Sequence, residues 1–128
     1  MTHPTIQLLI IDDEDDLLQV LNDTARAQGF EVTVAQSVDA AVALVEGGLV
    51  VGAVLCDVSM PDGGAAHWLR RCTAAYPALI GRTIVMTGWV SPTDSAALSQ
   101  IPEERWLSKP FTMSEVRQLV VRMLSAAS

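Results

Sequence analysis

Four apolar runs of this sequence are each ended or followed by side chains that can do chemistry. In chain order these are Asp12, Asp13, Asp57, Thr87 and Lys109. A few carboxylates with room for water suit Mg²⁺, and a carboxylate such as Asp57 can be a nucleophile toward a phosphoryl group. Lys109 and the cation would offset charge on the transferring oxygens, and the Thr87 hydroxyl would donate to the new phosphoryl group. These residue types predict phosphoryl transfer to Asp57, provided that the fold brings them together.

Three aspartates brought to one place would repel one another. Two unit charges about 4 Å apart at an effective dielectric constant of about 20 cost roughly 4 kcal/mol, so the cluster needs Lys109 and a divalent cation as counter-charges. Considered alone, the acidic run at residues 12–16 is also typical of a helix N-terminus, where the helix dipole favours acids. That alternative does not account for Asp57, which ends an apolar strand where an unpartnered acid is costly.

Five apolar segments of strand length alternate with segments of helical periodicity. Strands are expected at residues 6–11, 31–35, 50–56, 82–86 and 105–108, and helices at residues 15–28, 37–46, 65–75, 91–100 and 112–124. The alternation predicts an α/β fold, a flavodoxin-like (βα)5 three-layer sandwich with the parallel strand order 2-1-3-4-5. Ligands of such sheets lie at the carboxyl ends of the strands, where the chemistry-bearing residues are expected to meet.

Several residues mark the expected ends of helices. Ser37 is a predicted N-cap, and Thr112 is predicted to form a capping box with Glu115. Pro77 is expected to close the helix at residues 65–75.

Length and composition limit the class of protein. The chain has 128 residues, half of them hydrophobic, and a net charge of −7. These values predict a single domain over residues 1–128 with a core at about 6–124 and no output domain. An acidic surface argues against nucleic-acid binding. The sequence has no apolar window of about 18 residues, so membrane insertion is not expected. The N-terminus lacks a signal-peptide pattern, so a cytoplasmic location is expected, and Cys56 and Cys72 are expected to be buried free thiols.

Four local sequences carry a family resemblance: LLIIDDE, VLCDVSMPDGG, IVMTG and LSKPF. In this order, each at an expected strand end, they resemble the receiver domain of bacterial two-component response regulators over residues 6–124. The resemblance implies a Mg²⁺-dependent phosphoacceptor, with Mn²⁺ able to substitute, in two-component or phosphorelay signal transduction. The phosphoryl donor would be a phosphohistidine on a histidine kinase or a histidine phosphotransfer protein. Such a domain is a phosphoprotein with at most self-phosphorylation and self-dephosphorylation activity, not an enzyme.

The resemblance also implies a role for each matching residue. Asp57 would carry the aspartyl phosphate. It would also bind the metal together with Asp12, Asp13 and the backbone carbonyl of Ser59. Thr87 would be the switch hydroxyl.

Further implied roles concern the end of the expected fifth strand. Lys109 would pair with the phosphoryl group, and its bond to Pro110 would be a cis peptide. Trp106 occupies the place of the family's switch aromatic, usually Tyr or Phe, and whether its larger ring swings in the same way is left open. Ser59 and Trp89 occupy positions that tune hydrolysis of the acyl phosphate, and bulky Trp89 is expected to shield it from water.

A second departure from the family follows Met60, in the sequence PDGGAA. The family often has an Asp-Gly pair where this chain has Gly64 and Ala65. The change is expected to alter a loop and not the chemistry.

Two other functions stay open from the sequence. An aspartyl-phosphate-type phosphatase usually has D-x-D after the first strand, with the second Asp as acid and base. This chain has Asp-Asp-Glu there, and Asp57 is followed by Val58-Ser59, so that acid is missing at both places. A pseudo-receiver scaffold would have lost phosphorylation, although the expected side chains are present. The stretch at residues 81–111 is similar to receivers of hybrid histidine kinases, while the opening MTHPT favours a free-standing protein. A partner surface is expected on the helix at 91–100, the strand at 105–108 and the helix at 112–124.

Overall fold

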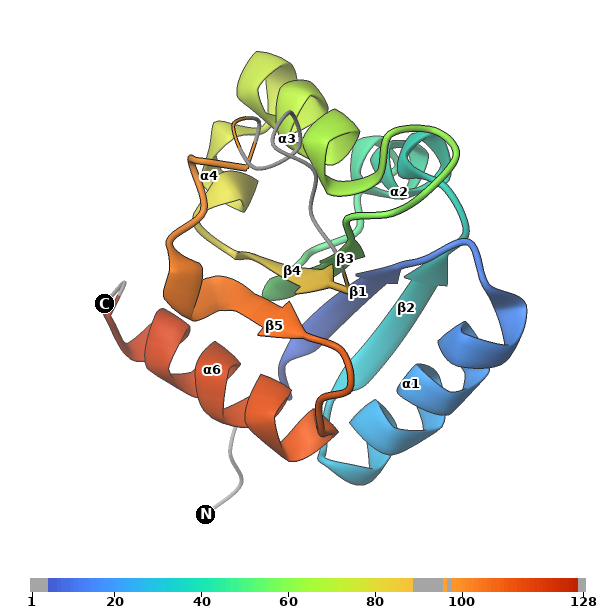
Figure 1. The fold of residues 1–128 in the computed structure, drawn as a ribbon, viewed down its shortest axis with the longest axis vertical. Helices are drawn as coiled ribbons and strands as arrows, with labels where there is room; N and C mark the ends of the chain where they lie inside the picture. The colour runs from blue at the N-terminus through green and yellow to red at the C-terminus, as the bar shows by residue number, and fades with distance from the viewer. Residues whose placement is uncertain (1–4, 89–95, 97, 127–128) are drawn as a thin grey trace.

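The computed structural model describes residues 5–88, 96 and 98–126 of the chain (Figure 1). Its five parallel strands form one sheet in the order β2-β1-β3-β4-β5, the flavodoxin-like order that the sequence predicts. The strands are β1 (Gln7–Ile11), β2 (Glu31–Ala35), β3 (Ala53–Asp57), β4 (Thr83–Thr87) and β5 (Trp106–Ser108). The described helices are α1 (Asp15–Ala27), α2 (Val38–Glu46), α3 (Gly64–Ala75), α4 (Pro77–Ile80) and α6 (Met113–Ala126), with a short 3₁₀ helix, η1, at Glu103–Arg105.

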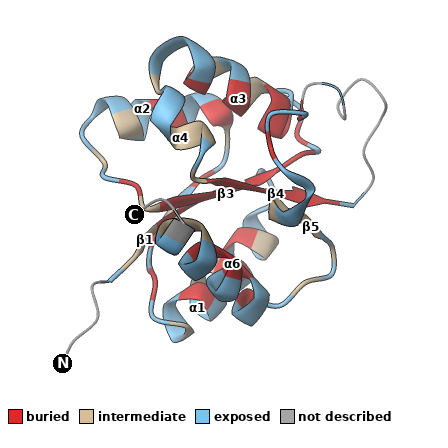
Figure 2. Ribbon diagram, turned by 90° about the vertical axis from the view of Figure 1, so that its left-hand side faces the viewer, coloured by how far each residue is buried: buried red, intermediate tan, exposed pale blue. Residues whose placement is uncertain are grey.

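Helices cover both faces of the sheet and give three layers (Figure 2). α1 and α6 lie on one face, whereas α2, α3 and α4 lie on the other. In β1, Leu9 and Ile11 belong to the core beneath α2 and α3, while Leu8 and Ile10 belong to the core beneath α1 and α6. Because both faces of β1 are buried, its sequence is apolar without alternation.

Capping residues fix the starts of two helices: Ser37 is the N-cap that was predicted, and Thr112 makes one of the two bonds of the predicted capping box. The Ser37 hydroxyl accepts a hydrogen bond from the backbone N–H of Ala40 at 3.0 Å, at the start of α2. The Thr112 hydroxyl accepts one from the backbone N–H of Glu115 at 3.2 Å, before α6. Each bond satisfies an N–H group that the first turn of a helix leaves without an intrahelical partner.

The helix α3 ends before Pro77, as predicted, but Pro77 has a second role that was not predicted. α3 ends at Ala75, but Pro77 then begins the four-residue helix α4. Proline is tolerated at the first position of a helix because its missing N–H would have no partner there. The expected helix at residues 91–100 lies mostly outside the described residues.

The strand β2 has the expected bounds, whereas the ends of the other strands differ from the expected ones by up to three residues, and two of these differences concern the site. β3 begins at Ala53 instead of residue 50 and ends on Asp57 itself. β4 likewise ends on Thr87. Within the described part of the chain, no helix has the length and apolar character needed to cross a bilayer.

Candidate functional site

The carboxyl ends of the strands bring the predicted residues to one edge of the sheet. Asp12 directly follows β1, and its backbone N–H donates to Ala35 O of β2 at 3.1 Å. Asp57 is paired with Met86 in the register of β3 and β4. Thr87 is paired with Ser108 of β5, and Lys109 directly follows Ser108 in the chain. Parallel register therefore places at one edge residues that are far apart in the sequence.

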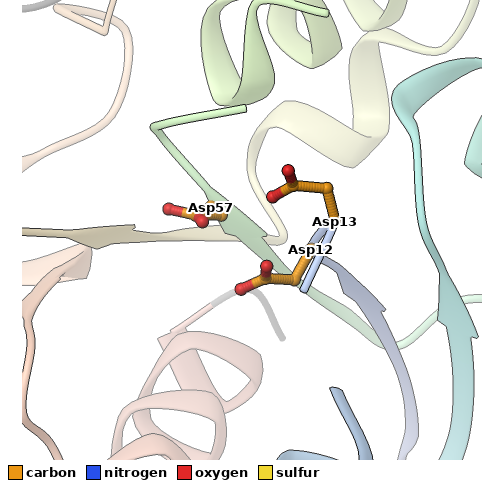
Figure 3. A group of neighbouring side chains, drawn as sticks. All are labelled: Asp12, Asp13 and Asp57. Carbon is orange, nitrogen blue, oxygen red and sulfur yellow. The ribbon is translucent and has the colours of Figure 1, made fainter. Parts of the chain in front are cut away.

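Three carboxylates form a cluster at this edge. One carboxylate oxygen from each of Asp12, Asp13 and Asp57 lies within 4.8 Å of the other two. Asp12 is fully buried and Asp57 is only 4% exposed, whereas Asp13 is exposed. Figure 3 shows the three side chains extending to the same side from the ends of β1 and β3. The arrangement is a set of oxygen ligands with one face open to solvent, which suits a hard divalent cation.

A backbone N–H group holds one oxygen of each buried carboxylate. Asp12 Oδ1 accepts the backbone N–H of Glu14 at 3.0 Å, and Asp57 Oδ1 accepts the backbone N–H of Ser59 at 3.2 Å. Asp12 Oδ2 is buried and has no hydrogen-bond partner among the described residues. An orphaned buried carboxylate oxygen is costly, and a cation bound between the three aspartates would satisfy it.

The pKa of Asp12 is raised above its ordinary value of 3.8. Burial is the largest cause, and the charges of Asp57 and Asp13 raise it further. The Glu14 N–H bond and the charge of Lys109 act in the opposite direction. Burial and the two neighbouring carboxylates thus disfavour the charged form of Asp12, and a bound cation would offset both effects.

Lys109 supplies the positive charge of the described site. Its Nζ lies 3.4 Å from Asp57 Oδ2 and 4.0 Å from Asp12 Oδ2. The backbone N–H of Lys109 donates to Thr87 O at 2.8 Å, which ties the residue to the end of β4. The peptide bond from Lys109 to Pro110 is cis, the isomer that the resemblance implied. One ammonium group beside three carboxylates leaves a negative balance when all are ionised.

Thr87 and Trp106 lie on adjacent strands but make separate contacts. Thr87 is 6% exposed, and its hydroxyl donates to Leu107 O at the long distance of 3.5 Å. Trp106 pairs in register with Val85, and its indole Nε1–H donates to Ile101 O at 2.8 Å. The Trp106 ring is half-buried against the core beneath α2 and α3. In this structure the indole is thus held toward Ile101.

The remaining predicted residues stand as follows. Ser59 is exposed and its backbone N–H contacts Asp57. Trp89 lies outside the described residues. Cys56 and Cys72 are buried free thiols as predicted, and burial raises the pKa of Cys72 to about 12.

One residue near the site was missed by sequence reasoning. Asp62, in the loop between β3 and α3, accepts the backbone N–H of Val38 at 2.8 Å and that of Gly64 at 3.1 Å. The Asp-Gly-Gly sequence signals the local bond to Gly64, since Asp favours such turns. The bond to Val38 joins positions 24 residues apart and has no sequence signal.

Comparison with known protein families gives one match that covers most of the chain. Residues 8–121 match the model of the response regulator receiver domain. The chain is also 26% identical over 125 residues to the transcriptional regulatory protein ZraR of Escherichia coli strain K12. That alignment covers 98% of this chain and 28% of ZraR, so the chain spans less than a third of this curated relative.

Solved structures share the fold across nearly the whole chain. A response regulator receiver domain protein from Clostridium thermocellum is 25% identical with a TM-score of 0.78, and the match covers 95% of this chain and 96% of that one. A CheY-like receiver domain protein from Methanospirillum hungatei JF-1 is 20% identical with a TM-score of 0.78, covering 96% and 99%. The receiver domain of a histidine kinase from Syntrophus aciditrophicus is 20% identical with a TM-score of 0.80, covering 95% and 92%.

Proposed function

Because this chain belongs to the response regulator receiver domain family, we propose that Asp57 accepts a phosphoryl group in two-component signal transduction. The observation that carries the proposal is the environment of Asp57. Its Oδ2 lies 3.4 Å from Lys109 Nζ, and its carboxylate shares a cluster with Asp12 and Asp13. A nearly buried carboxylate with a lysine and further oxygen ligands beside it suits attack on phosphorus followed by stabilisation of the product.

The donor in this proposal is a phosphohistidine on a histidine kinase or a histidine phosphotransfer protein. An oxygen of Asp57 attacks phosphorus, an O–P bond forms and the N–P bond to the donor imidazole breaks. The electron pair of that bond stays on the imidazole nitrogen, which takes a proton from solvent. The product on this chain is an acyl phosphate.

Asp12, Asp13 and Asp57, with the backbone carbonyl of Ser59, would hold Mg²⁺, and Mn²⁺ would substitute. The ligand set is all oxygen, and the orphaned Asp12 Oδ2 offers a lone pair that the described residues do not use. When bound, the ion offsets negative charge on the transferring phosphoryl oxygens.

Lys109 and Thr87 act on the phosphoryl group after transfer. Lys109 exchanges its contact with Asp57 Oδ2 for one with a phosphoryl oxygen, a charge-assisted bond. Thr87 exchanges its long bond to Leu107 O for donation to another phosphoryl oxygen. Movement of these two residues carries the state of Asp57 to the end of β4 and to β5, beside the expected partner surface.

Intact mass after incubation with acetyl phosphate and Mg²⁺ tests the proposal. We expect a gain of one phosphoryl group, abolished in Asp57→Asn and in excess EDTA. No uptake by the wild-type chain would favour a scaffold, and repeated turnover of a phosphate ester would favour a phosphatase. An undiminished gain in Asp57→Asn would place the acceptor elsewhere.

A further inference from the structure

The carboxylate of Asp62 connects two elements beside the site. Its Oδ2 accepts the backbone N–H of Val38, the first residue of α2, at 2.8 Å. Its Oδ1 accepts the backbone N–H of Gly64, the first residue of α3, at 3.1 Å. Both oxygens are therefore used, each by a different helix start.

The bond to Val38 gives α2 a second cap from outside the helix. Ser37 already accepts the N–H of Ala40 in the same first turn. The Val38 N–H has no intrahelical acceptor, because first-turn N–H groups lack one. A carboxylate at a helix N-terminus is also favoured by the helix dipole. Asp62 thus fastens its loop to a helix that begins 24 positions earlier in the chain.

The bond to Gly64 fixes the return of the loop onto Asp57. Gly64 has a φ of +57°, and a Cβ placed on it would lie 2.3 Å from Val58 O and 2.7 Å from Asp57 O. The backbone at Gly64 thus packs directly on the carbonyl groups of Asp57 itself and of Val58, the next residue. Ser59 follows Val58 in the chain, and its backbone N–H donates a hydrogen bond to Asp57 Oδ1. The orientation of this short segment depends on where Gly64 is held.

We propose that Asp62 is a positioning residue of the phosphoacceptor site. By holding Gly64 on one side and Val38 on the other, it fixes the course of the backbone from Asp57 to Ser59. It thereby sets the place of the Ser59 carbonyl relative to the aspartates. This inference rests on the proposed function, in which that carbonyl is a metal ligand. It adds a path from the site to α2.

Mg²⁺ titration of the 128-residue chain, followed by backbone amide NMR, tests the proposal. Asp62→Asn keeps the size of the side chain but replaces one of its two acceptor oxygens by a donor NH₂ group. We expect Mg²⁺ affinity to fall about tenfold, the loss typical of residues that orient metal ligands. We also expect the Ser59 and Val38 amide signals to shift before any Mg²⁺ is added.

Ser37→Ala is the matched control, because it removes a cap from the same turn of α2 without touching the loop. We expect it to lower stability but to leave Mg²⁺ affinity within about twofold of wild type. Equal losses of affinity in Ser37→Ala and Asp62→Asn would reduce the role of Asp62 to helix stability and overturn the proposal.

Asp62→Glu separates position from charge, since it keeps the negative charge and moves the oxygens by one methylene. Positioning predicts weakened Mg²⁺ binding, whereas full affinity would assign the effect to charge and overturn the proposal. If wild type fails to bind Mg²⁺, both the proposed function and this inference fail. If wild type binds Mg²⁺ and Asp62→Asn binds it equally well, only this inference fails.

Discussion

At the scale of single residues, the environment of Asp12 disfavours its negative charge. It is fully buried, one of its oxygens has no hydrogen-bond partner among the described residues, and Lys109 Nζ is 4.0 Å from that oxygen. Burial and the neighbouring carboxylates raise its pKa. A carboxyl whose pKa is higher in the folded than in the unfolded protein lowers stability as pH rises, because the unfolded state releases its proton more readily.

Asp12→Asn should therefore stabilise the metal-free protein at neutral pH, by about 1 kcal/mol. The gain should be complete above the folded-state pKa of Asp12 and should vanish as pH falls below its ordinary value of 3.8. Urea unfolding in EDTA, measured at neutral pH and at low pH, checks this. A destabilised Asp12→Asn at neutral pH would show that the Asp12 charge is already compensated without metal.

Trp106 illustrates what residue identity alone leaves open. Its position in the sequence matches the family's switch aromatic, but only coordinates show that its indole N–H donates to Ile101 O. Phe has no such donor, so the hydrogen bond belongs to this residue type. The partner is a backbone carbonyl, which every residue carries, and for that reason the sequence does not identify it.

At the scale of elements, the loop from β3 to α3 is packed so closely at Gly64 that it leaves no room for a side chain. Gly64 combines a positive φ with close contact to two carbonyl oxygens. Gly29, after α1, also has a positive φ of +91°, but a Cβ there would meet nothing within 4 Å. The two glycines therefore separate the cost of backbone conformation from the cost of a clash.

Gly64→Ala should lower the free energy of unfolding by about 3 kcal/mol, because a left-handed conformation and a steric clash add together. Gly29→Ala should cost only about 1 kcal/mol, since conformation alone is involved. Urea unfolding of both variants measures the difference. Equal losses would mean that the loop moves away from Val58 O at little cost, contrary to the tight packing described above.

At the scale of the whole molecule, the sequence predicted the sheet and its order because each strand is an apolar run between turn or helix signals. Strand ends were off by up to three residues, as at Ala53, since apolar residues continue into the preceding loop. The meeting of Asp12, Asp13, Asp57 and Lys109 was predictable because parallel strands align their carboxyl ends. Their chemical roles stay predictions.

Long-range hydrogen bonds between a side chain and the backbone were the part that could not be predicted. Asp62 reaches Val38 only because α2 and α3 lie on the same face of the sheet (Figure 1), which depends on the assembled fold. The helical start at Pro77 was missed for a local reason, because proline both ends and begins helices.

Chemical trapping of the acyl phosphate identifies the residue that accepts the phosphoryl group. After incubation with acetyl phosphate and Mg²⁺, borohydride reduces an aspartyl phosphate to homoserine, which peptide mass spectrometry assigns to one position. We expect homoserine at position 57, formed only when phosphodonor and Mg²⁺ are both present. Homoserine at another aspartate, or none in a chain shown by intact mass to carry a phosphoryl group, would contradict it.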